Sequence, residues 1–221
     1  AQPCRWKYAL VEEKRPGMYF PIEDSEDGGT YILNSKDMCM IEHIPELVKA
    51  GITSFKIEGR AKSEYYVSVV TNAYRRAIDG YFETLSDSYR PEQWILDEMR
   101  KISYRDYCTG FFFGDPKDDA NISLRGGYNR EWDVMAVVEE WKDGVAFCTQ
   151  RNRFFNGDDL EVLESDKPPF TVTAVGLKNS DNEPIEAANH PMMHFSFDCA
   201  TPLENGAILR KERDEAARVI V

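Results

Sequence analysis

Apolar residues recur with two different spacings in the first half of the chain. Residues 5–34 contain aromatic and β-branched runs separated by Gly- and Asp-containing turns, which is typical of short strands. From Ile41 to Lys49 the apolar positions follow helical spacing instead, and Gly51 is expected to end that helix. A further short strand is predicted over residues 53–57.

The clearest helical pattern follows directly after this strand. Ser63 is the predicted N-cap, and the apolar positions from Tyr66 to Ala77 trace one face of a helix that is expected to stop at Gly80. Pro91 can begin a second helix, because proline is favoured in the first helical turn. Helix, strand and helix in close succession indicate an α/β architecture for this part of the chain.

The pattern changes in the second half of the chain. From Trp132 onward, short β-rich runs alternate with turns such as Asp143-Gly144. Evenly spaced strands of this kind are typical of a small closed barrel. We therefore expect an α+β fold with two domains. Residues 1–120 would be the end of an α/β domain, and residues 121–221 would form a small all-β barrel.

The chain is acidic, with a formal net charge of −12, which argues against a broad nucleic-acid-binding surface. The acid is unevenly distributed: residues 1–90 hold 12 basic and 14 acidic residues, whereas residues 91–221 hold 15 and 25. The first part can therefore carry a local cationic site. No apolar run approaches the roughly 18 residues needed to span a bilayer, so we expect no membrane partner.

Five cysteines are scattered along the chain. A secreted disulfide scaffold would be denser in cysteine and usually even in number, so we expect reduced thiols and a cytoplasmic protein. Cys39, Cys108, Cys148 and Cys199 lie in or beside apolar runs and are expected to be buried structural thiols. The chain begins at Ala1 rather than at a methionine, which suggests a piece of a longer protein.

The densest polar cluster follows the strand predicted over residues 53–57. Its candidate functional residues are Glu58, Arg60, Lys62, Tyr65 and Tyr66. In parallel α/β folds, sites form where strands lead into helices. Arg60 offers a bidentate guanidinium, Lys62 offers a point charge, and the following helix N-terminus adds partial positive charge. This combination suits a substrate that carries a carboxylate or a phosphate, with a tyrosine stacked on it or hydrogen-bonded to it.

A purely structural interpretation of the same residues stays open. Arg60 and Glu58 could form an ion pair that closes the strand, with Lys62 in solvent and one of the two tyrosines buried in the core. Structural ion pairs of this kind are common. Residue types and spacing alone do not decide between the two interpretations.

Several longer motifs resemble a known family. Cys-Arg-Trp-Lys-Tyr at 4–8, Asn-Ser-Lys-Asp-Met-Cys at 34–39, and the block at 47–60 that ends in Phe-Lys-Ile-Glu-Gly-Arg resemble the U32 peptidase family, also called collagenase-like proteases. Gln-Arg-Asn-Arg-Phe at 150–154 and Gly-Ala-Ile-Leu-Arg at 206–210 resemble the family's C-terminal β-barrel extension. The resemblance covers nearly the whole chain.

This resemblance implies a larger fold and a cofactor. The α/β part would be the C-terminal portion of a TIM-barrel-like catalytic domain, most of which would precede this chain. Relatives hold an iron–sulfur cluster with cysteines, and the last member of that set would correspond to Cys4. A cluster needs about four thiolates. We therefore expect no cofactor in this fragment and a cluster only in the full-length protein.

The resemblance also implies an RNA-modifying activity. Similar members of the family are associated with hydroxylation of a tRNA or rRNA base, and some depend on prephenate, a dicarboxylate. Arg60 and Lys62 would then hold a carboxylate or a phosphate, Glu58 would orient them or move a proton, and a tyrosine would support the substrate. The fragment alone is expected to be inactive.

Two alternatives remain beside RNA hydroxylation. The family name implies a hydrolase, a collagenase-like endopeptidase with a peptide substrate, although no Ser-His-Asp or Cys-His arrangement can be assembled from this chain. A non-enzymatic alternative makes the β-barrel a docking module for RNA or protein. Under the RNA-modification hypothesis, the acidic barrel could bind phosphates only if one face were locally basic through Arg125, Arg130, Arg151 and Arg153.

Overall fold

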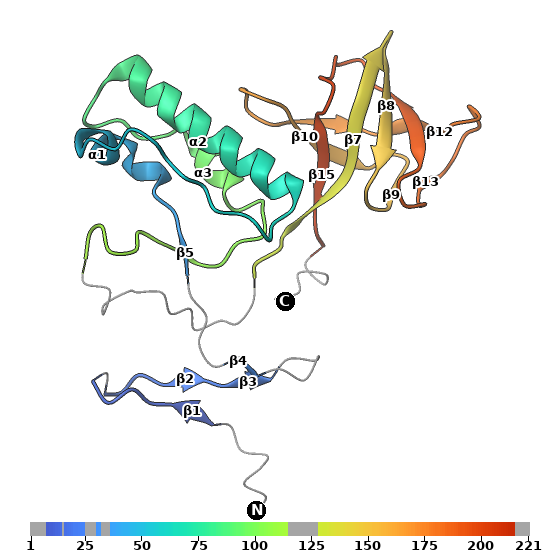
Figure 1. The fold of residues 1–221 in the computed structure, drawn as a ribbon. Coiled ribbons are helices and arrows are strands. Elements are labelled where there is room, and N and C mark those ends of the chain that lie inside the picture. Colours follow the sequence, from blue (N-terminus) through green and yellow to red (C-terminus); the bar gives the residue numbers. More distant parts are fainter. Residues whose placement is uncertain (1–7, 15, 25–29, 32–35, 115–127, 215–221) are drawn as a thin grey trace, which may run out of the picture. The chain divides into compact units, whose positions relative to one another are not determined.

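A computed structural model describes residues 8–14, 16–24, 30–31, 36–114 and 128–214 (Figure 1). The chain forms two compact units. Of the described residues, those up to Met40 and those in 103–114 and 128–130 belong to the first unit, and residues 41–102 and 131–214 belong to the second. No helix among the described residues is long and apolar enough to cross a membrane.

The first unit contains three short strand pairs. Its elements are β1 (Ala9–Leu10), β2 (Phe20–Pro21), β3 (Glu23–Asp24), β4 (Thr30–Tyr31), β5 (Asp37–Met38) and β6 (Tyr107–Cys108). The β1–β2 and β3–β4 pairs are antiparallel, whereas β5 and β6 are parallel. Strands were expected over residues 5–34, and at the described positions of this range they are present but only two residues long. Arg105 also binds the Asp37 carboxylate through its guanidinium, with Nη2 at 2.7 Å.

The second unit begins with helices. They are η2 (Ile41–His43), α1 (Ile44–Lys49), α2 (Glu64–Thr84) and α3 (Gln93–Glu98). Ile44 of α1, Ala77 of α2 and Ile95 of α3 are almost fully buried, as the spacing of apolar residues predicts. Pro91 precedes α3, and Gly51, with φ +83°, follows α1. The predicted helices are therefore confirmed.

The long helix α2 starts where the sequence predicts and ends later. The Ser63 hydroxyl accepts a hydrogen bond from the Tyr66 amide at 3.3 Å, which is the expected N-cap contact. The helix passes through Gly80 and ends at Thr84, and the C-cap residue Leu85 has a left-handed φ of 47°. Gly80 has another role, because a Cβ there would lie 2.6 Å from the Tyr89 hydroxyl. The glycine gives Tyr89 room to pack on α2 rather than stopping the helix.

The strand predicted over residues 53–57 does not form in the second unit. The described backbone from Ile52 to Gly59 has no regular secondary structure, although Phe55 and Ile57 carry the β-prone side chains that suggested a strand. A strand is defined by hydrogen bonds to a neighbour, and no neighbouring strand is assigned to this segment in the described part of the chain. The prediction was wrong because side-chain preference alone does not provide a partner.

The rest of the second unit is an antiparallel β-structure. Its strands are β7 (Trp132–Lys142), β8 (Val145–Gln150), β9 (Phe154–Phe155), β10 (Asp159–Leu163), β11 (Phe170–Thr173), β12 (Val175–Asn179), β13 (Ala187–Ala188), β14 (His194–Asp198) and β15 (Ile208–Glu212). Seven of them form one sheet in the order β11-β10-β15-β7-β8-β14-β12, while β9 pairs with β13. Asp143 and Gly144 both have positive φ in the β7–β8 hairpin, as the Asp-Gly pair predicts.

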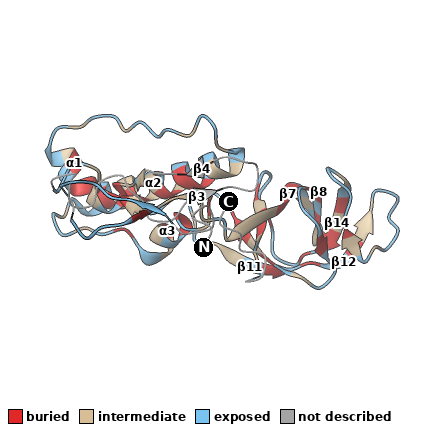
Figure 2. Ribbon diagram, turned by 90° about the horizontal axis from the view of Figure 1, so that it is seen from below, coloured by how far each residue is buried: buried red, intermediate tan, exposed pale blue. Residues whose placement is uncertain are grey.

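This sheet curls around a single apolar core. Alternate residues such as Leu160, Val162, Phe197 and Leu209 are buried and face one another inside the curl. Figure 2 shows the buried positions gathered along β7, β8 and β14. The two edge strands, β11 and β12, follow one another in sequence but are not hydrogen-bonded to each other. The all-β prediction is confirmed, whereas the sheet is a curled half-barrel rather than the closed barrel expected.

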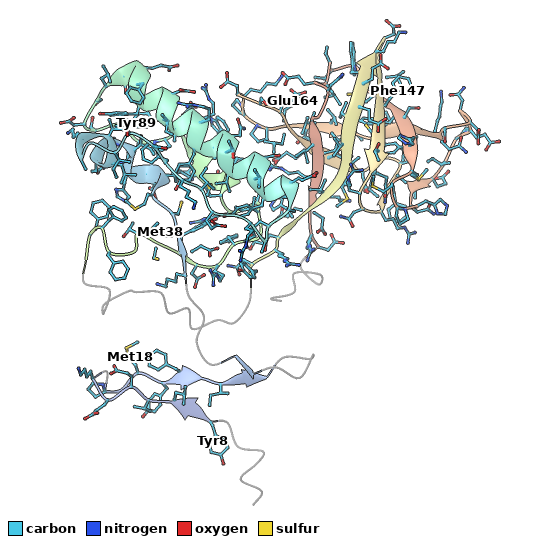
Figure 3. All side chains as sticks on the ribbon, viewed as in Figure 1. Tyr8, Met18, Met38, Tyr89, Phe147 and Glu164 are labelled. Atoms are coloured by element: carbon cyan, nitrogen blue, oxygen red, sulfur yellow. The ribbon has the colours of Figure 1, made fainter. Side chains whose placement is uncertain are left out.

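Helix α2 is fastened to the loop that follows β10, within the second unit. Asn72 donates to the Glu164 carbonyl at 3.5 Å and accepts from the Asp166 amide at 3.1 Å. Arg76 pairs with the Asp166 carboxylate at 2.6 Å. Glu164, labelled in Figure 3, is buried beside Lys167, with which it forms an ion pair. The helices and the half-barrel are therefore parts of one packed body.

The chain combines helices with an antiparallel sheet and is α+β. The TIM-barrel portion of the prediction is not confirmed, because the described residues contain a single parallel pair of two-residue strands.

Candidate functional site

The predicted polar cluster forms a tight turn in front of α2. The Glu58 carboxylate accepts a hydrogen bond from the Arg60 backbone amide at 3.0 Å, and the Lys62 amide donates to the Gly59 carbonyl at 2.8 Å. Glu58 and Arg60 are exposed, and Lys62 is half-buried. The ion pair between the Glu58 and Arg60 side chains that the structural interpretation required is replaced by a bond to the backbone.

Tyr66 packs against this turn. Its ring lies under the Lys62 ammonium, with Nζ 5.2 Å from the ring centroid. A Cβ added at Gly59 would lie 3.0 Å from Tyr66 Cε1, so the absence of a side chain at Gly59 allows the ring to approach the turn. Tyr66 is therefore the tyrosine that shares the turn with Lys62.

The turn carries a small excess of positive charge. Lys56, Arg60 and Lys62 lie within nine residues of sequence that also contain the acids Glu58 and Glu64. Ser63 caps the 21-residue helix α2 directly behind them, and the helix N-terminus adds partial positive charge. An exposed guanidinium, a half-buried ammonium and a helix N-terminus together can bind an anionic group.

Tyr65 lies in a different environment from the turn. Its hydroxyl donates to the Lys101 carbonyl at 2.8 Å and accepts from Arg210 Nη1 at 3.2 Å. Burial raises the pKa of Tyr65 to about 12, against the opposing effect of the Arg210 charge. The structure therefore brings Glu58, Arg60, Lys62 and Tyr66 together, and places Tyr65 in contact with the half-barrel.

Tyr65 is hydrogen-bonded to Arg210, which belongs to a buried network of charged side chains. Arg210 is fully buried and donates to Glu98 at 2.5 Å and to Glu161 at 2.5 and 2.8 Å. Lys101 donates to both Glu161 oxygens, at 2.7 and 2.9 Å, and lies 4.8 Å from the Trp132 ring centroid. Burial lowers the pKa of Arg210, but the hydrogen bond and negative charge of Glu98 outweigh this and raise it. Two cations and two carboxylates balance one another in this network.

Sequence reasoning missed this network. Successive side chains of a strand face opposite sides, so Leu209 of β15 points into the core of the half-barrel and Arg210 points to the other face of the sheet. From the strand alone, that other face is expected to contact solvent. The face is buried because Glu98 of α3 and Tyr65 of α2 cover it. The sequence offered little signal, because Arg210 ends the apolar run Ala-Ile-Leu at 207–209 and is followed by the charged residues Lys-Glu-Arg at 211–213.

An apolar pocket of about 640 Å³ lies between α2 and the segment that joins it to α1. Phe55 and Ile57 line one side, and Tyr74, Ile78 and Phe82 of α2 line the other. Phe82 is 54% exposed. Glu58, Arg60 and Lys62 are not among the lining residues of this pocket. The pocket suits an apolar group rather than an anion.

Two family models match the chain in succession. The model of peptidase family U32 matches residues 1–122, and the model of the peptidase family U32 C-terminal domain matches residues 130–210. The first match alone spans more than half of the 221 residues. The chain belongs to peptidase family U32. The family resemblance of the sequence motifs is thereby confirmed.

Relatives in the U32 family carry two kinds of name. The tRNA hydroxylation protein P1 of Bacillus subtilis is 30% identical over 95% of this chain and 50% of its own length. The tRNA hydroxylation protein P of Escherichia coli is 34% identical over 82% of this chain and 39% of its own length. A collagenase of Porphyromonas gingivalis is 32% identical over 52% of this chain and 26% of its own length. The chain thus spans half or less of these relatives.

Among solved structures, the C-terminal domain of a Geobacillus thermoleovorans protein of the U32 family matches 36% of this chain and 99% of its own length. The identity is 27% and the TM-score is 0.34.

The described residues of this U32 chain do not provide a ligand set for an iron–sulfur cluster. Cys108, Cys148 and Cys199 are buried, as predicted, whereas Cys39 is half-buried. Burial raises the pKa of Cys148, which disfavours the thiolate that a metal needs. The described parts of the chain contain no group of three metal-binding side chains. Cys4, the predicted ligand, lies outside the described residues.

Proposed function

We propose that the full-length protein hydroxylates a base in tRNA or rRNA. The observation that carries this proposal is how far the relatives named tRNA hydroxylation proteins extend along the chain. The two reported above align with 95% and 82% of it, which takes in both U32 regions. Other relatives of the same name align with 47–82% of the chain, and the collagenase aligns with 52%. The half-barrel is therefore part of what the chain shares with the first two relatives.

The turn in front of α2 would bind an anionic group of the reaction. Arg60 would form a bidentate contact and Lys62 a point-charge contact with a carboxylate, as of a dicarboxylate such as prephenate, or with an RNA phosphate. Glu58 holds the turn through the Arg60 amide and would orient the guanidinium. Tyr66, under Lys62, would support the substrate, while Tyr65 stabilises the contact with the half-barrel.

The remaining features of the full-length enzyme are also proposals. The segment around the turn would complete a TIM-barrel-like catalytic domain together with residues that this chain does not contain. An iron–sulfur cluster would be held by Cys4 and by cysteines outside this chain, and would supply redox chemistry. We expect a cytoplasmic enzyme, because its substrate would be cellular RNA.

The test is complementation in an Escherichia coli strain that lacks its own tRNA hydroxylation protein P. Full-length protein should restore a nucleoside heavier by one oxygen atom in digests of total tRNA or rRNA, measured by liquid chromatography and mass spectrometry. Arg60→Gln with Lys62→Gln should abolish it. Arg100→Gln with Lys142→Gln is the matched control, because it removes two exposed cations elsewhere. An unchanged nucleoside profile with wild-type protein would contradict the proposal.

The collagenase relative supports a second candidate, a U32 endopeptidase. Purified full-length protein would then cleave gelatin, and Glu58→Gln would abolish cleavage while leaving the protein folded. Activity that is equal in wild type and Glu58→Gln would point to a contaminating protease instead.

A further inference from the structure

The loop between β8 and β9, together with the end of β9, exposes two arginines and an aromatic ring. The exposed positions lie between and beside two buried side chains. Gln150 and Phe154 are buried at 3% and 1% exposure, while Arg151, Arg153 and Phe155 are exposed. Phe154 and Phe155 face opposite sides because successive side chains of a strand alternate. Arg151, Arg153 and Phe155 are thus all accessible to a ligand.

The loop is held in place by hydrogen bonds to neighbouring backbone groups. The amides of Arg151 and Asn152 both donate to the Met135 carbonyl, at 2.7 and 3.1 Å. The Asn152 side chain donates to the Val134 carbonyl at 2.8 Å. Gln150 accepts from the Met192 amide at 3.2 Å, which fixes the neighbouring loop before β14. Because the backbone is already ordered, a ligand would not have to order it on binding.

Each arginine lies against an apolar or soft surface rather than against a carboxylate. The Arg153 guanidinium is 4.7 Å from the Phe155 ring centroid. Arg151 Nη1 is 3.2 Å from the Met192 sulfur and donates to the Gln150 carbonyl at 3.1 Å. Phe155 is 47% exposed and Met192 is 58% exposed. Within the described residues, no salt bridge forms at Arg151 or Arg153, whereas Arg210 and four other arginines have carboxylate partners.

Two acids near these residues, Glu139 and Asp158, have other partners. Glu139 accepts from Thr149 and lies 3.2 Å from His194 Nδ1. The hydrogen bond from Thr149 is the main cause of the lowered pKa of Glu139, and Arg151 adds a smaller charge effect. Asp158 binds the Phe155 amide at 2.9 Å and pairs with Lys211 at 2.8 Å. The two guanidinium charges are therefore available to an external anion.

We propose that Arg151, Arg153 and Phe155 form a contact site for single-stranded RNA. Guanidinium groups bind phosphates, and an exposed aromatic ring stacks on bases; proteins that bind single strands combine these two features. The acidic character of the rest of the chain favours a local contact over a broad electrostatic surface. The proposal rests on the proposed RNA hydroxylation, for which the site would position an unpaired loop or end of the substrate.

Binding of chain 1–221 to a fluorescein-labelled oligouridine strand tests the site directly. Arg151→Glu with Arg153→Glu should weaken binding at least tenfold in fluorescence anisotropy. Two lost phosphate contacts should also reduce the slope of log affinity against log salt by about 1.4. Phe155→Ala should weaken binding about fivefold or more. Arg100→Glu with Lys142→Glu changes the net charge equally at exposed positions elsewhere, and should have the smaller effect.

Equal losses in the two charge-reversed proteins would overturn the proposal, as would undetectable binding by the wild type. Stronger, Arg151-dependent binding of oligoglutamate than of oligouridine would assign the surface to an acidic protein instead, and would also overturn it. The variants alter exposed side chains, and thermal unfolding monitored by circular dichroism verifies that they fold.

Failure of the site and failure of the proposed function give different results. Site-dependent oligouridine binding without restored hydroxylation in the Escherichia coli strain keeps the site and refutes the activity. Restored hydroxylation that is unaffected by Arg151→Glu with Arg153→Glu, at limiting expression of the full-length protein, keeps the activity and refutes the site.

Discussion

Arg210 of β15 donates through Nη2 to Glu98 of α3 at 2.5 Å, and both side chains are almost completely shielded from solvent. The bond joins residues that are 112 positions apart in sequence. It connects the helices of the second unit to its half-barrel, and Glu161 and Lys101 complete the charge balance. A buried charged group is tolerated only when it is paired in this way.

Loss of Arg210 should destabilise the second unit strongly. Arg210→Met leaves Glu98 and Glu161 in a buried site with Lys101 as their one remaining cation, so we expect a loss of about 3–5 kcal/mol in the free energy of unfolding. Urea denaturation monitored by tryptophan fluorescence measures this loss. Adding Glu98→Gln to Arg210→Met should recover part of it.

A matched arginine in the same strand region provides the control. Arg213 makes a bidentate contact with Asp133, at 2.6 and 2.8 Å, but both side chains are partly exposed. Arg213→Met should therefore cost about 1 kcal/mol or less. Similar losses for Arg210→Met and Arg213→Met would show that burial of the network contributes nothing.

Tyr65 should make stability depend on pH in alkaline solution. Its folded-state pKa of about 12 lies above the ordinary value of 10, so the folded protein keeps a proton that the unfolded chain releases. The contribution is complete below pH 10 and is lost as pH rises through about 12, at a rate of about 1.4 kcal/mol per pH unit. Urea denaturation between pH 9 and about 12 should show a shallower decline for Tyr65→Phe. If the free energy of unfolding falls equally steeply with pH in the wild type and in Tyr65→Phe, Tyr65 is not the source of the pH dependence.

Local sequence signals predicted the helices of this chain well. Ser63 caps α2 through its own hydroxyl, and the apolar spacing from Val70 to Ala77 is buried as expected. These features depend on residues within one or two turns of each other. The helix was wrongly predicted to end at Gly80. The glycine is needed there because the Tyr89 side chain, which comes from outside the helix, packs against that position.

The parts that depend on distant partners could not be read from the sequence. The segment 53–57 has the composition of a strand but has no strand partner in the described part of the chain. Arg210 looks solvent-facing from strand alternation, and its burial follows from α3, more than 100 residues earlier. In the candidate site, residue types predicted a cationic turn, but only the fold separates Tyr66, which packs on the turn, from Tyr65, which does not.

The cap of α2 should be measurable as a separate contribution to stability. Ser63→Ala removes the acceptor of the Tyr66 amide and should cost about 1 kcal/mol. Ser63→Asp retains an acceptor and adds negative charge at the helix N-terminus, so it should keep most of the stability. Urea denaturation of the two variants checks this. Equal losses for alanine and aspartate would show that the cap bond does not contribute.

Gly59 should control the packing of Tyr66 on the turn. The Cβ of Gly59→Ala would lie 3.0 Å from Tyr66 Cε1, so the ring must shift by a few tenths of an ångström and move away from Lys62. We expect a modest loss of stability, about 1 kcal/mol or less, and a larger loss of hydroxylation by full-length protein, because one end of the anion-binding turn is displaced.

A double-mutant cycle separates this contact from a general effect of alanine at Gly59. In a Tyr66→Leu background the ring is absent, so Gly59→Ala should change the free energy of unfolding by little. Gly114→Ala is the control, since a Cβ there meets nothing within 4 Å. If Gly59→Ala costs the same with and without the Tyr66 ring, the close approach is not what the glycine provides. The turn would then hold Lys62 by its backbone bonds alone.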